Sequence, residues 1–258
     1  MISLGRLRVL LAHEMRVNSR DPLPLLVMVV FPVITMAFLK PAFQPALVEA
    51  GHAGANGAEH VVPGQAVVGA FFVVSLVTFG FFSEHTAKTW DRLRASPAAS
   101  LEIVLGKALP RVVLGIVQFV VIFSAGVLLF GLEIRGSTWT LVPIVVALAL
   151  SLALLGVAVT AICRTAQQAN AFAIVGMVLF GAIGGALVPF DVLPDWAQVI
   201  APVTPTYWAM DGFNAVILDG DGIGGVAAPV GVLLGMAALF TVIALRRLRF
   251  DEQKIGWA

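Results

Sequence analysis

The sequence predicts an all-α polytopic membrane protein with an N-terminal amphipathic interfacial helix, six transmembrane helices and a re-entrant outer helical hairpin between spans five and six. Three observations predict this fold. The 258 residues are 59% hydrophobic and 12% charged, and their mean hydropathy of +0.98 is typical of polytopic membrane proteins. Six apolar stretches each approach the ~20 residues that cross a bilayer as a helix. The charged residues gather between these stretches, with the basic ones on one side.

Residues 1–21 are predicted to form the amphipathic interfacial helix. At about 100° per residue, one side is apolar and the other is basic. The apolar side comprises Leu4, Leu7, Leu11 and Met15, and the basic side Arg6, His13, Arg16 and Arg20. Such a helix lies in the headgroup layer, where its cations face anionic lipid; a solvated N-terminal arm is the alternative. Charges throughout the segment predict no cleavable signal peptide.

Residues 22–258 are predicted to form one transmembrane domain. Its six spans are expected at residues 23–39, 61–83, 108–130, 139–163, 169–188 and 226–245. Pro24 and Pro32 predict a kink in the first span, because proline removes a helical hydrogen bond. Lys107 and Arg111 stand at the start of the third span, and their long stems are expected to snorkel to the interface.

The distribution of Lys and Arg predicts the orientation, because cytoplasmic loops carry an excess of basic residues. The basic residues of the predicted cytoplasmic side are Arg6, Arg8, Arg16, Arg20, Lys88, Arg92, Arg94, Lys107, Arg111, Arg164, Arg246, Arg247, Arg249 and Lys254. Only Lys40 and Arg135 fall on the other side. We therefore expect a multi-pass protein of the plasma (inner) membrane, with both termini and the loop 84–107 in the cytoplasm.

The loop 84–107 is the one long charged, helix-capable interruption between spans. Its charged residues at helical spacing are Glu84, Lys88, Asp91, Arg92 and Arg94, with Trp90 and Leu93 between them. Ser96-Pro97 ends this helix, because proline disfavours the helical conformation of the residue before it. Ser100 and Glu102 then predict the cap and the acidic first turn of the next helix. The loop is predicted to be a surface that a soluble partner contacts; a solvated loop face is the alternative.

The segment 189–225 predicts the re-entrant outer hairpin. It is mostly apolar, yet it is broken by Pro189, Pro194, Pro202 and Pro205. Two short amphipathic helices are expected, one through Val192, Trp196, Val199 and Ile200 and one through Tyr207, Met210, Asn214 and Ile217. Both are too short to span the bilayer. Trp196, Tyr207 and Trp208 suit the depth of the membrane–water interface.

The sequence carries no motif for catalysis. Gly106-Lys107 is followed by Ala108 and lacks the earlier glycine of a phosphate-binding loop. The single cysteine, Cys163, and the four scattered histidines form no metal motif. Serines within the spans have no histidine base nearby in sequence and are interpreted as structural. We therefore expect no enzymatic activity of the chain alone, no catalytic residue, no bound metal or cofactor, and no nucleic-acid partner.

The interiors of the spans contain polar residues but no acid or base, which argues against an ion-coupled transporter. Thr78, Gln118 and Phe119 are the residues predicted to line a substrate pathway. Gln118 has an alternative role, because its amide could instead hydrogen-bond across helices.

Two motifs carry a resemblance to a known family. The run Thr89-Trp-Asp-Arg-Leu-Arg-Ala-Ser-Pro97, followed by Leu101-Glu-Ile103 and Gly106-Lys107, resembles the first cytoplasmic loop of the type-2 ABC exporter permeases. That loop reads roughly Gly-Thr-Leu-Glu-Arg-Leu-x-x-Ser/Thr-Pro, and Lys88 stands where the family commonly has glycine. The second motif, Pro-x-x-x-Leu-Pro-x-Trp with a later Pro-Thr-Tyr in residues 189–211, is similar to the family's outer segment.

The resemblance implies a permease subunit that pairs with a second permease copy or close paralogue and with two ABC ATPase subunits, on which ATP and Mg are bound. The ATPase-coupling residues would be Glu84, Lys88, Trp90, Asp91, Arg92, Leu93 and Arg94, and the N-terminal helix would be the family's connecting helix. The expected function is export of a hydrophobic or amphipathic compound, drug or lipid-like, by ATP-driven alternating access. The alternatives are a polysaccharide or glycolipid exporter of the same architecture and a membrane scaffold or channel outside the ABC transporters.

Overall fold

The computed structural model describes residues 5, 8, 11, 12, 14, 16, 23–49, 51, 52, 54–87, 89, 90, 95, 96 and 99–247. Over these residues the regular structure is helical and contains no strand, which confirms the all-α fold class. The elements are α2 Leu23–Glu49, α3 Ala58–Ala70, α4 Phe72–Thr86, α6 Ser100–Phe130, η1 Thr138–Thr140, α7 Leu141–Ile162, α8 Ala166–Ile183, η2 Phe190–Val192, α9 Asp195–Ile200, η3 Ala201–Val203, α10 Pro205–Ile217 and α11 Ile223–Arg247.

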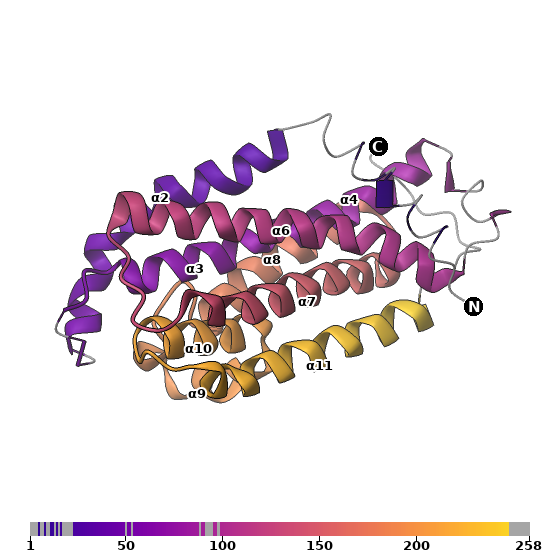
Figure 1. The fold of residues 1–258 in the computed structure, drawn as a ribbon. Helices are drawn as coiled ribbons and strands as arrows, with labels where there is room; N and C mark the ends of the chain where they lie inside the picture. The colour runs from indigo at the N-terminus through magenta and orange to yellow at the C-terminus, as the bar shows by residue number, and fades with distance from the viewer. Residues whose placement is uncertain are drawn as a thin grey trace.

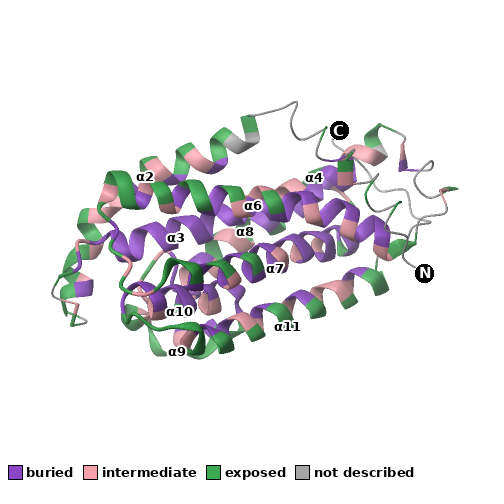
Figure 2. Ribbon diagram, viewed as in Figure 1, coloured by how far each residue is buried: buried purple, intermediate pink, exposed green. Residues whose placement is uncertain are grey.

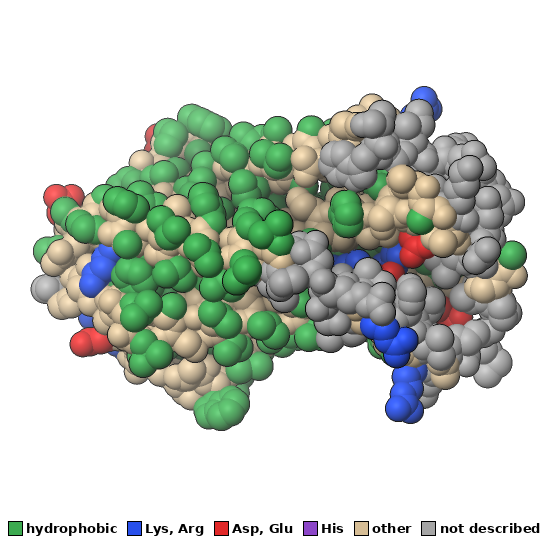
Figure 3. Space-filling model, turned by 90° about the horizontal axis from the view of Figure 1, so that it is seen from above, with side chains coloured by type: hydrophobic (Ala, Val, Ile, Leu, Met, Phe, Trp, Pro, Cys, Tyr) green, Lys and Arg blue, Asp and Glu red, His purple; other side chains and the backbone are tan. Residues whose placement is uncertain are grey.

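Among the described residues, six helical segments are long and apolar enough to cross a membrane. They are Leu26–Glu49, Ala58–Glu84, Ser100–Phe130, Thr138–Ile162, Ala166–Ile183 and Ile223–Arg247. The second combines α3 and α4, which meet at Phe71. These segments confirm the six predicted spans, and Figure 3 shows hydrophobic side chains over the middle of one face, with charged side chains towards its ends.

The spans form a bundle with α3, α4 and α7 at its centre. In an apolar stretch of 18 residues within each span, about 72% of the residues are buried in α3–α4 and 67% in the span that contains α7. In the four other spans the share is 17–33%. Figures 1 and 2 show this arrangement: buried residues run along α3 and α7, while α2 and α11 lie outside with exposed faces. Gly156 of α7 permits the close approach of α4, because a Cβ there would lie 2.9 Å from the Cβ of Val77.

Helix α2 extends beyond the predicted end of the first span at residue 39. It continues to Glu49 through Pro41 and Pro45. The Lys40 Nζ donates a hydrogen bond to the carbonyl oxygen of Phe130 at 2.6 Å, so the extension packs beside the end of α6.

Helix α6 also begins earlier than the apolar stretch predicted. Ala99 is the residue before the helix, and the Glu102 carboxylate accepts a hydrogen bond from its backbone N–H. Ser100 is therefore the first helical residue, and its predicted role as the cap was wrong, whereas Glu102 does lie in the first turn. The 31 residues of α6 extend over about 46 Å at 1.5 Å per residue. Because this exceeds the ~30 Å of hydrocarbon, part of the helix projects beyond it.

The segment between α8 and α11 contains the expected short helices α9 and α10, with η2 and η3 beside them. Helix α10 packs against α7, α8 and α11, and its Met210 and Ile217 are buried. Helix α9 instead presents Trp196 and Val199, which are 62% and 80% exposed. The re-entrant depth of this hairpin stays a prediction.

The predicted amphipathic helix of residues 1–21 lies largely outside the described residues. The residues described there are Gly5, Arg8, Leu11, Ala12, Glu14 and Arg16, and each is helical. Arg8 and Arg16 are exposed, whereas Glu14 is buried. The acid of this short segment therefore faces the bundle.

Candidate functional site

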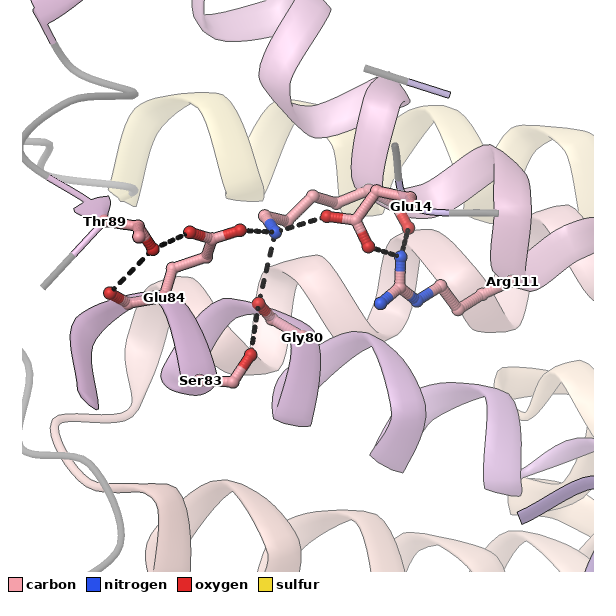
Figure 4. A network of polar contacts seen from close by, with 7 residues as sticks. Glu14, Gly80, Ser83, Glu84, Thr89 and Arg111 are labelled. Atoms are coloured by element: carbon pink, nitrogen blue, oxygen red, sulfur yellow. Dashed lines mark hydrogen bonds and ion pairs between the residues drawn. The ribbon is translucent and has the colours of Figure 1, made fainter. Parts of the chain in front are cut away.

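Four charged side chains, three buried and one partly buried, meet at the end of the second span and the start of the third. This charge cluster consists of Glu14, Glu84, Lys107 and Arg111, whose side chains are 8%, 19%, 5% and 5% exposed. Glu14 comes from the N-terminal segment, Glu84 from the last turn of α4, and the two basic residues from the third and fourth turns of α6. Figure 4 shows Glu14, Glu84 and Arg111 pointing towards one another.

Lys107 is the centre of the cluster. Its Nζ lies 2.6 Å from Glu14 Oε1 and 2.9 Å from Glu84 Oε1, and it also donates to the carbonyl oxygen of Gly80 at 3.2 Å. The same ammonium lies 5.6 Å from the ring centroid of Phe81, within the range of a cation–π contact. Three donated hydrogen bonds use all three N–H groups of the ammonium.

Arg111 lies one turn further along α6 and shares Glu14 with Lys107. Its Nη1 donates to Glu14 Oε2, so the two oxygens of one carboxylate bind two different cations. Gly80 makes room for this arginine, because a Cβ at Gly80 would lie 2.5 Å from Arg111 Nη2 and 3.2 Å from its Cζ. A small residue in α4 is therefore part of the site.

The cluster contains two acids and two bases, so its formal charges cancel. Charges removed from water are stabilised only if each is paired and hydrogen-bonded. Each of the four has an ion-pair partner, and Arg111 Nε is the one buried donor of the cluster without an acceptor among the described residues. Burial raises the pKa of the Glu14 carboxyl, but the charges of Lys107 and Arg111 together act more strongly and hold it below its ordinary value of 4.5. Glu14 is therefore ionised at neutral pH, and its ion pairs hold the N-terminal segment against the start of α6.

The polypeptide that leaves α4 is tied to the cluster. The Thr89 hydroxyl donates to Glu84, to its backbone oxygen at 3.3 Å and to its carboxylate. Trp90 follows and is only 4% exposed; its ring lies 6.2 Å from that of Phe81. The start of the loop 84–107 is thus held against the bundle, and Trp90 packs inwards.

The predicted coupling residues fall into two groups. Glu84 and Trp90 are described, and both face the bundle, as shown above. Lys88, Asp91, Arg92, Leu93 and Arg94 lie outside the described residues. The contact of this loop with an ATPase stays a prediction.

The three residues predicted for a substrate pathway lie in different surroundings. Thr78 is buried and donates to the carbonyl oxygen of Ser75 in its own helix. Gln118 is fully buried, and its Nε2 donates across helices to the carbonyl oxygen of Ala66 at 3.1 Å, which is the structural alternative foreseen for it. Phe119 lines a cavity between α6 and α7. The structure does not gather the three into one site.

Two of the three predicted aromatic residues of the outer hairpin contact each other. The rings of Tyr207 and Trp208 meet edge to face at 5.2 Å, and Phe190 lies 5.2 Å from Tyr207. Trp208 Nε1 donates to the carbonyl oxygen of Pro202. Trp196 is largely exposed on α9.

The charge cluster was not predicted from the sequence, because Lys107 and Arg111 were expected to snorkel to the interface. Instead both are 4% exposed as whole residues. Two signals could have indicated the pairing. The two bases stand four residues apart, on one face of a helix, and Glu14 is the one acid of the basic segment 1–20.

The two basic residues at the opposite end of the bundle also have partners. Lys40 donates to the carbonyl of Phe130, the last residue of α6, and Arg135 Nη1 donates to that of Leu218, just after α10, at 2.8 Å. Both cations thus lie at helix C-termini, where the helix dipole favours positive charge. The described residues contain no group of three or more His, Cys, Asp or Glu that could hold a metal ion.

Comparison with known proteins relates the chain to membrane permeases. It is 29% identical over 160 residues to the linearmycin resistance permease protein LnrN of Bacillus subtilis, covering 62% of this chain and 41% of that one. It is 26% identical over 146 residues to the probable multidrug ABC transporter permease YbhR of Escherichia coli, covering 56% of this chain and 40% of that one. A third relative is the ABC transporter G family member 20 of Dictyostelium discoideum. It is 24% identical over 206 residues, which cover 79% of this chain and 28% of that one.

The matched region spans about two fifths of the length of the first two relatives. The family model described as ABC-2 type transporter matches residues 5–218, which include the charge cluster and the outer hairpin as far as the end of α10. Together with the helical spans, this match shows that the chain belongs to the ABC-2 type transporter family.

Proposed function

We infer that this chain is the membrane-spanning permease subunit of an ABC exporter that moves a hydrophobic or amphipathic compound across the plasma membrane. ATP would be hydrolysed on a partner ATPase, and the permease would alternate between inward- and outward-facing states. Family membership supports the transporter class and removes the alternative of a scaffold or channel outside the ABC transporters.

The observation that carries this proposal is the charge cluster at the base of the loop 84–107. It joins the N-terminal segment, the end of α4 and the start of α6 through short ion pairs, of which those of Glu14 are buried and that of Glu84 is partly buried. A push on the loop would therefore move these three segments as one unit rather than bend the loop alone. Rigid-body motion of packed helices between two arrangements is a common way for proteins to switch state.

The cargo is inferred from the chemistry of the spans. Helices α7 and α3–α4, the buried centre of the bundle, carry hydroxyl and amide groups but no acid or base between His60 and Glu84 or between Thr138 and Ile162. A hydrophobic or amphipathic compound suits such an interior better than a polyanion. The names of two relatives, for linearmycin resistance and a probable multidrug permease, support the same class.

The proposed assembly contains two ABC ATPase subunits and a second permease copy or close paralogue. The loop 84–107 and both termini would lie in the cytoplasm, as the excess of basic residues indicates. In this assembly Asp91, Arg92, Leu93 and Arg94 would contact the ATPase, while Glu84 and Trp90 anchor the loop to the permease. ATP and Mg would be held by the ATPase.

The test is affinity purification of the full chain from its native membrane, with mass spectrometry of the proteins retained. An ABC ATPase is expected with the wild type, and Leu93→Asp or Arg92→Glu should abolish its retention. Glu133→Lys, a charge reversal on an exposed loop at the opposite end of the bundle, is the matched control and should retain the ATPase. Retention by both loop variants would show that the loop is not the coupling surface.

The cargo class is tested separately in nanodiscs that contain the purified complex. Amphipathic drugs and lipids should stimulate ATP hydrolysis, whereas soluble oligosaccharides should not. Stimulation by oligosaccharides or glycolipids alone would favour the polysaccharide exporter instead.

A further inference from the structure

Among the described residues, the buried apolar side chains of the bundle form two large clusters that lie end to end along the spans. The inner cluster lies at the end that carries the charge cluster, and the outer cluster at the other end. Four spans each contribute residues to both, which are, with the outer one first, Met36 and Met28 in α2, Ala70 and Val77 in α3–α4, Phe119 and Val112 in α6, and Leu233 and Ala237 in α11. On α7 the two clusters meet within residues 148–153. The boundary between them therefore crosses five spans.

Close approaches between helices place these crossings in one layer. Gly115 of α6 lies between Val112 of the inner cluster and Phe119 of the outer cluster. A Cβ on Gly115 would lie 3.1 Å from Cγ2 of Val73 in α4 and 3.4 Å from the Cβ of Ala149 in α7. The cluster boundary therefore lies at the same depth in α4, α6 and α7.

Helices α2, α3 and α6 cross in the same layer, beside Gly69 of α3. A Cβ on Gly69 would lie 3.2 Å from Cγ of Pro32 in α2 and 2.7 Å from Nε2 of Gln118 in α6. The Thr35 hydroxyl of α2 donates to Gln65 Oε1 of α3 at 2.7 Å, and Gln118 donates to α3 as described above. The crossing is thus closely packed and hydrogen-bonded, as a pivot between helices requires.

The backbone hydrogen bonding of two spans is interrupted at this crossing. Pro32 in α2 has no N–H to donate to the carbonyl four residues earlier. The second span breaks at Phe71, two residues after Gly69. There Phe71 N–H donates to the Val68 oxygen and Val74 N–H to the Phe71 oxygen, each three residues back instead of four. Such a short 3-10 stretch within a helix often marks a hinge, and helices bend most readily at proline.

Two buried side chains at the boundary leave hydrogen bonds unmade. Gln118 Oε1 and Ser151 Oγ, the latter on α7 where the clusters meet, have no partner among the described atoms. A rearrangement in this layer gives up few hydrogen bonds and offers these atoms new partners.

The inner half of the bundle is the part that holds the loop 84–107. Trp90 belongs to the inner cluster, together with Phe81, whose ring lies beside the Lys107 ammonium. A movement of the loop is therefore transmitted first to the inner half.

We propose that the cluster boundary is a hinge, at which the inner half of the bundle tilts against the outer half about the crossing at Gly69. Pro32 and the break at Phe71 take up the bending. That this tilt is the step by which ATP-driven movement of the loop 84–107 reaches the outer half rests on the proposed function. The weak backbone at the boundary is a property of the chain alone.

The backbone is tested by hydrogen–deuterium exchange and mass spectrometry of the full chain in nanodiscs. Peptides over residues 70–75 should exchange severalfold faster than those over 62–67 and 76–81, which lie in α3 and α4 on either side of the break. Equal exchange in the three peptides of the wild type, which needs no variant to fold, would overturn the hinge.

A proline variant provides a matched comparison in α2. Pro32→Ala supplies the missing N–H and should slow exchange over residues 29–34 severalfold. Pro45→Ala, at an exposed proline of the same helix, should leave exchange over 29–34 unchanged. Unchanged exchange in Pro32→Ala would remove α2 from the hinge and overturn the proposal as stated.

The motion is tested by distances between pairs of spin labels in the complex with its ATPase, reconstituted in nanodiscs. The labels are placed in a Cys163→Ala background, because Cys163 is the single cysteine of the chain. An excess of unlabelled permease leaves one labelled chain in each complex. The exposed label sites are Phe38 and Ile223 in the outer half and Leu26 and Leu245 in the inner half.

Trapping the complex with ADP and vanadate should leave the two distances within a half, Phe38 to Ile223 and Leu26 to Leu245, unchanged. At least one distance across the boundary, Phe38 to Leu245 or Leu26 to Ile223, should change by several ångströms. Equal changes within and across the halves, or none across them while the complex hydrolyses ATP, would overturn the hinge. A chain that retains no ATPase would overturn the proposed function instead, and the exchange measurement then decides on the hinge alone.

Discussion

Lys107 and Glu14, which are 93 positions apart in the chain, form a buried ion pair with 2.6 Å between Nζ and Oε1. Because Arg111 shares the same carboxylate, one acid of the N-terminal segment neutralises two cations at the start of α6. The pairing fastens that segment to the transmembrane bundle.

Glu14→Gln should destabilise the protein by about 3–5 kcal/mol, because it leaves a buried cation uncompensated. Thermal unfolding of the purified protein measures this. Arg8→Gln, at an exposed position of the same segment, should change stability by less than about 0.5 kcal/mol. The double variant Glu14→Gln/Arg111→Met should recover part of the loss, since it removes the cation that has lost its partner while Lys107 keeps Glu84; equal losses in the double and single variants would contradict the pairing.

The same ion pairs predict a dependence of stability on pH. The pKa of Glu14 is lowered in the folded protein from its ordinary value of 4.5, so its contribution is present above that value and is lost as the pH falls through the lower folded pKa. The difference in melting temperature between wild type and Glu14→Gln should therefore stay constant from about pH 8 to pH 6 and shrink below about pH 4.5. A difference that instead grows on acidification would mean that the Glu14 pKa is raised.

Gly80→Ala should destabilise the protein although alanine favours helices. The gain in helix propensity is about 1 kcal/mol, but the new Cβ would lie 2.5 Å from Arg111 Nη2 and would displace a guanidinium that is buried and paired, at a cost of about 2–4 kcal/mol. Gly231→Ala in α11, where a Cβ would meet nothing within 4 Å, should be neutral or stabilising. Thermal unfolding of both variants measures this difference. Equal changes in melting temperature would show that the Arg111 side chain moves aside without a loss of stability.

Gln118→Met tests whether Gln118 belongs to a substrate pathway. Its amide bonds Ala66 across helices, and its Oε1 is buried without a partner among the described atoms. Loss of the bond costs about 1 kcal/mol, and removal of the unpaired oxygen offsets part of that. Stability should therefore change little, and the drug concentration that half-maximally stimulates ATP hydrolysis should stay the same. A shift in that concentration without a loss of stability would place Gln118 in contact with the cargo.

Much of the fold could be predicted because it depends on contiguous residues. The six spans, their apolar character and the short helices of the outer segment follow from hydropathy, length and proline positions. The predicted ends were less accurate: α2 runs through Pro41 and Pro45 to Glu49. Tertiary packing of that extension beside the end of α6 is not visible in a local hydropathy pattern.

The candidate site could be predicted only in part. The charged loop 84–107 was identified from its composition, and Glu84 and Trp90 were named. That both face the bundle, and that Glu84 binds Lys107, depends on how α4 meets α6. Lys107 and Arg111 stand at the start of a span, where long basic side chains often snorkel to the interface. Their four-residue spacing indicates that they share one helix face, but it does not show that Glu14 and Glu84 lie against that face.

The sequence by itself determined that this chain is helical and crosses a membrane, because a segment in hydrocarbon must satisfy its own backbone hydrogen bonds and hydropathy is a property of consecutive residues. Only the tertiary structure decided which charges are paired and which glycine makes room for them. The reason is physical: a Coulomb interaction depends on distance in space, and the partners of Lys107 lie 93 and 23 positions away in the chain.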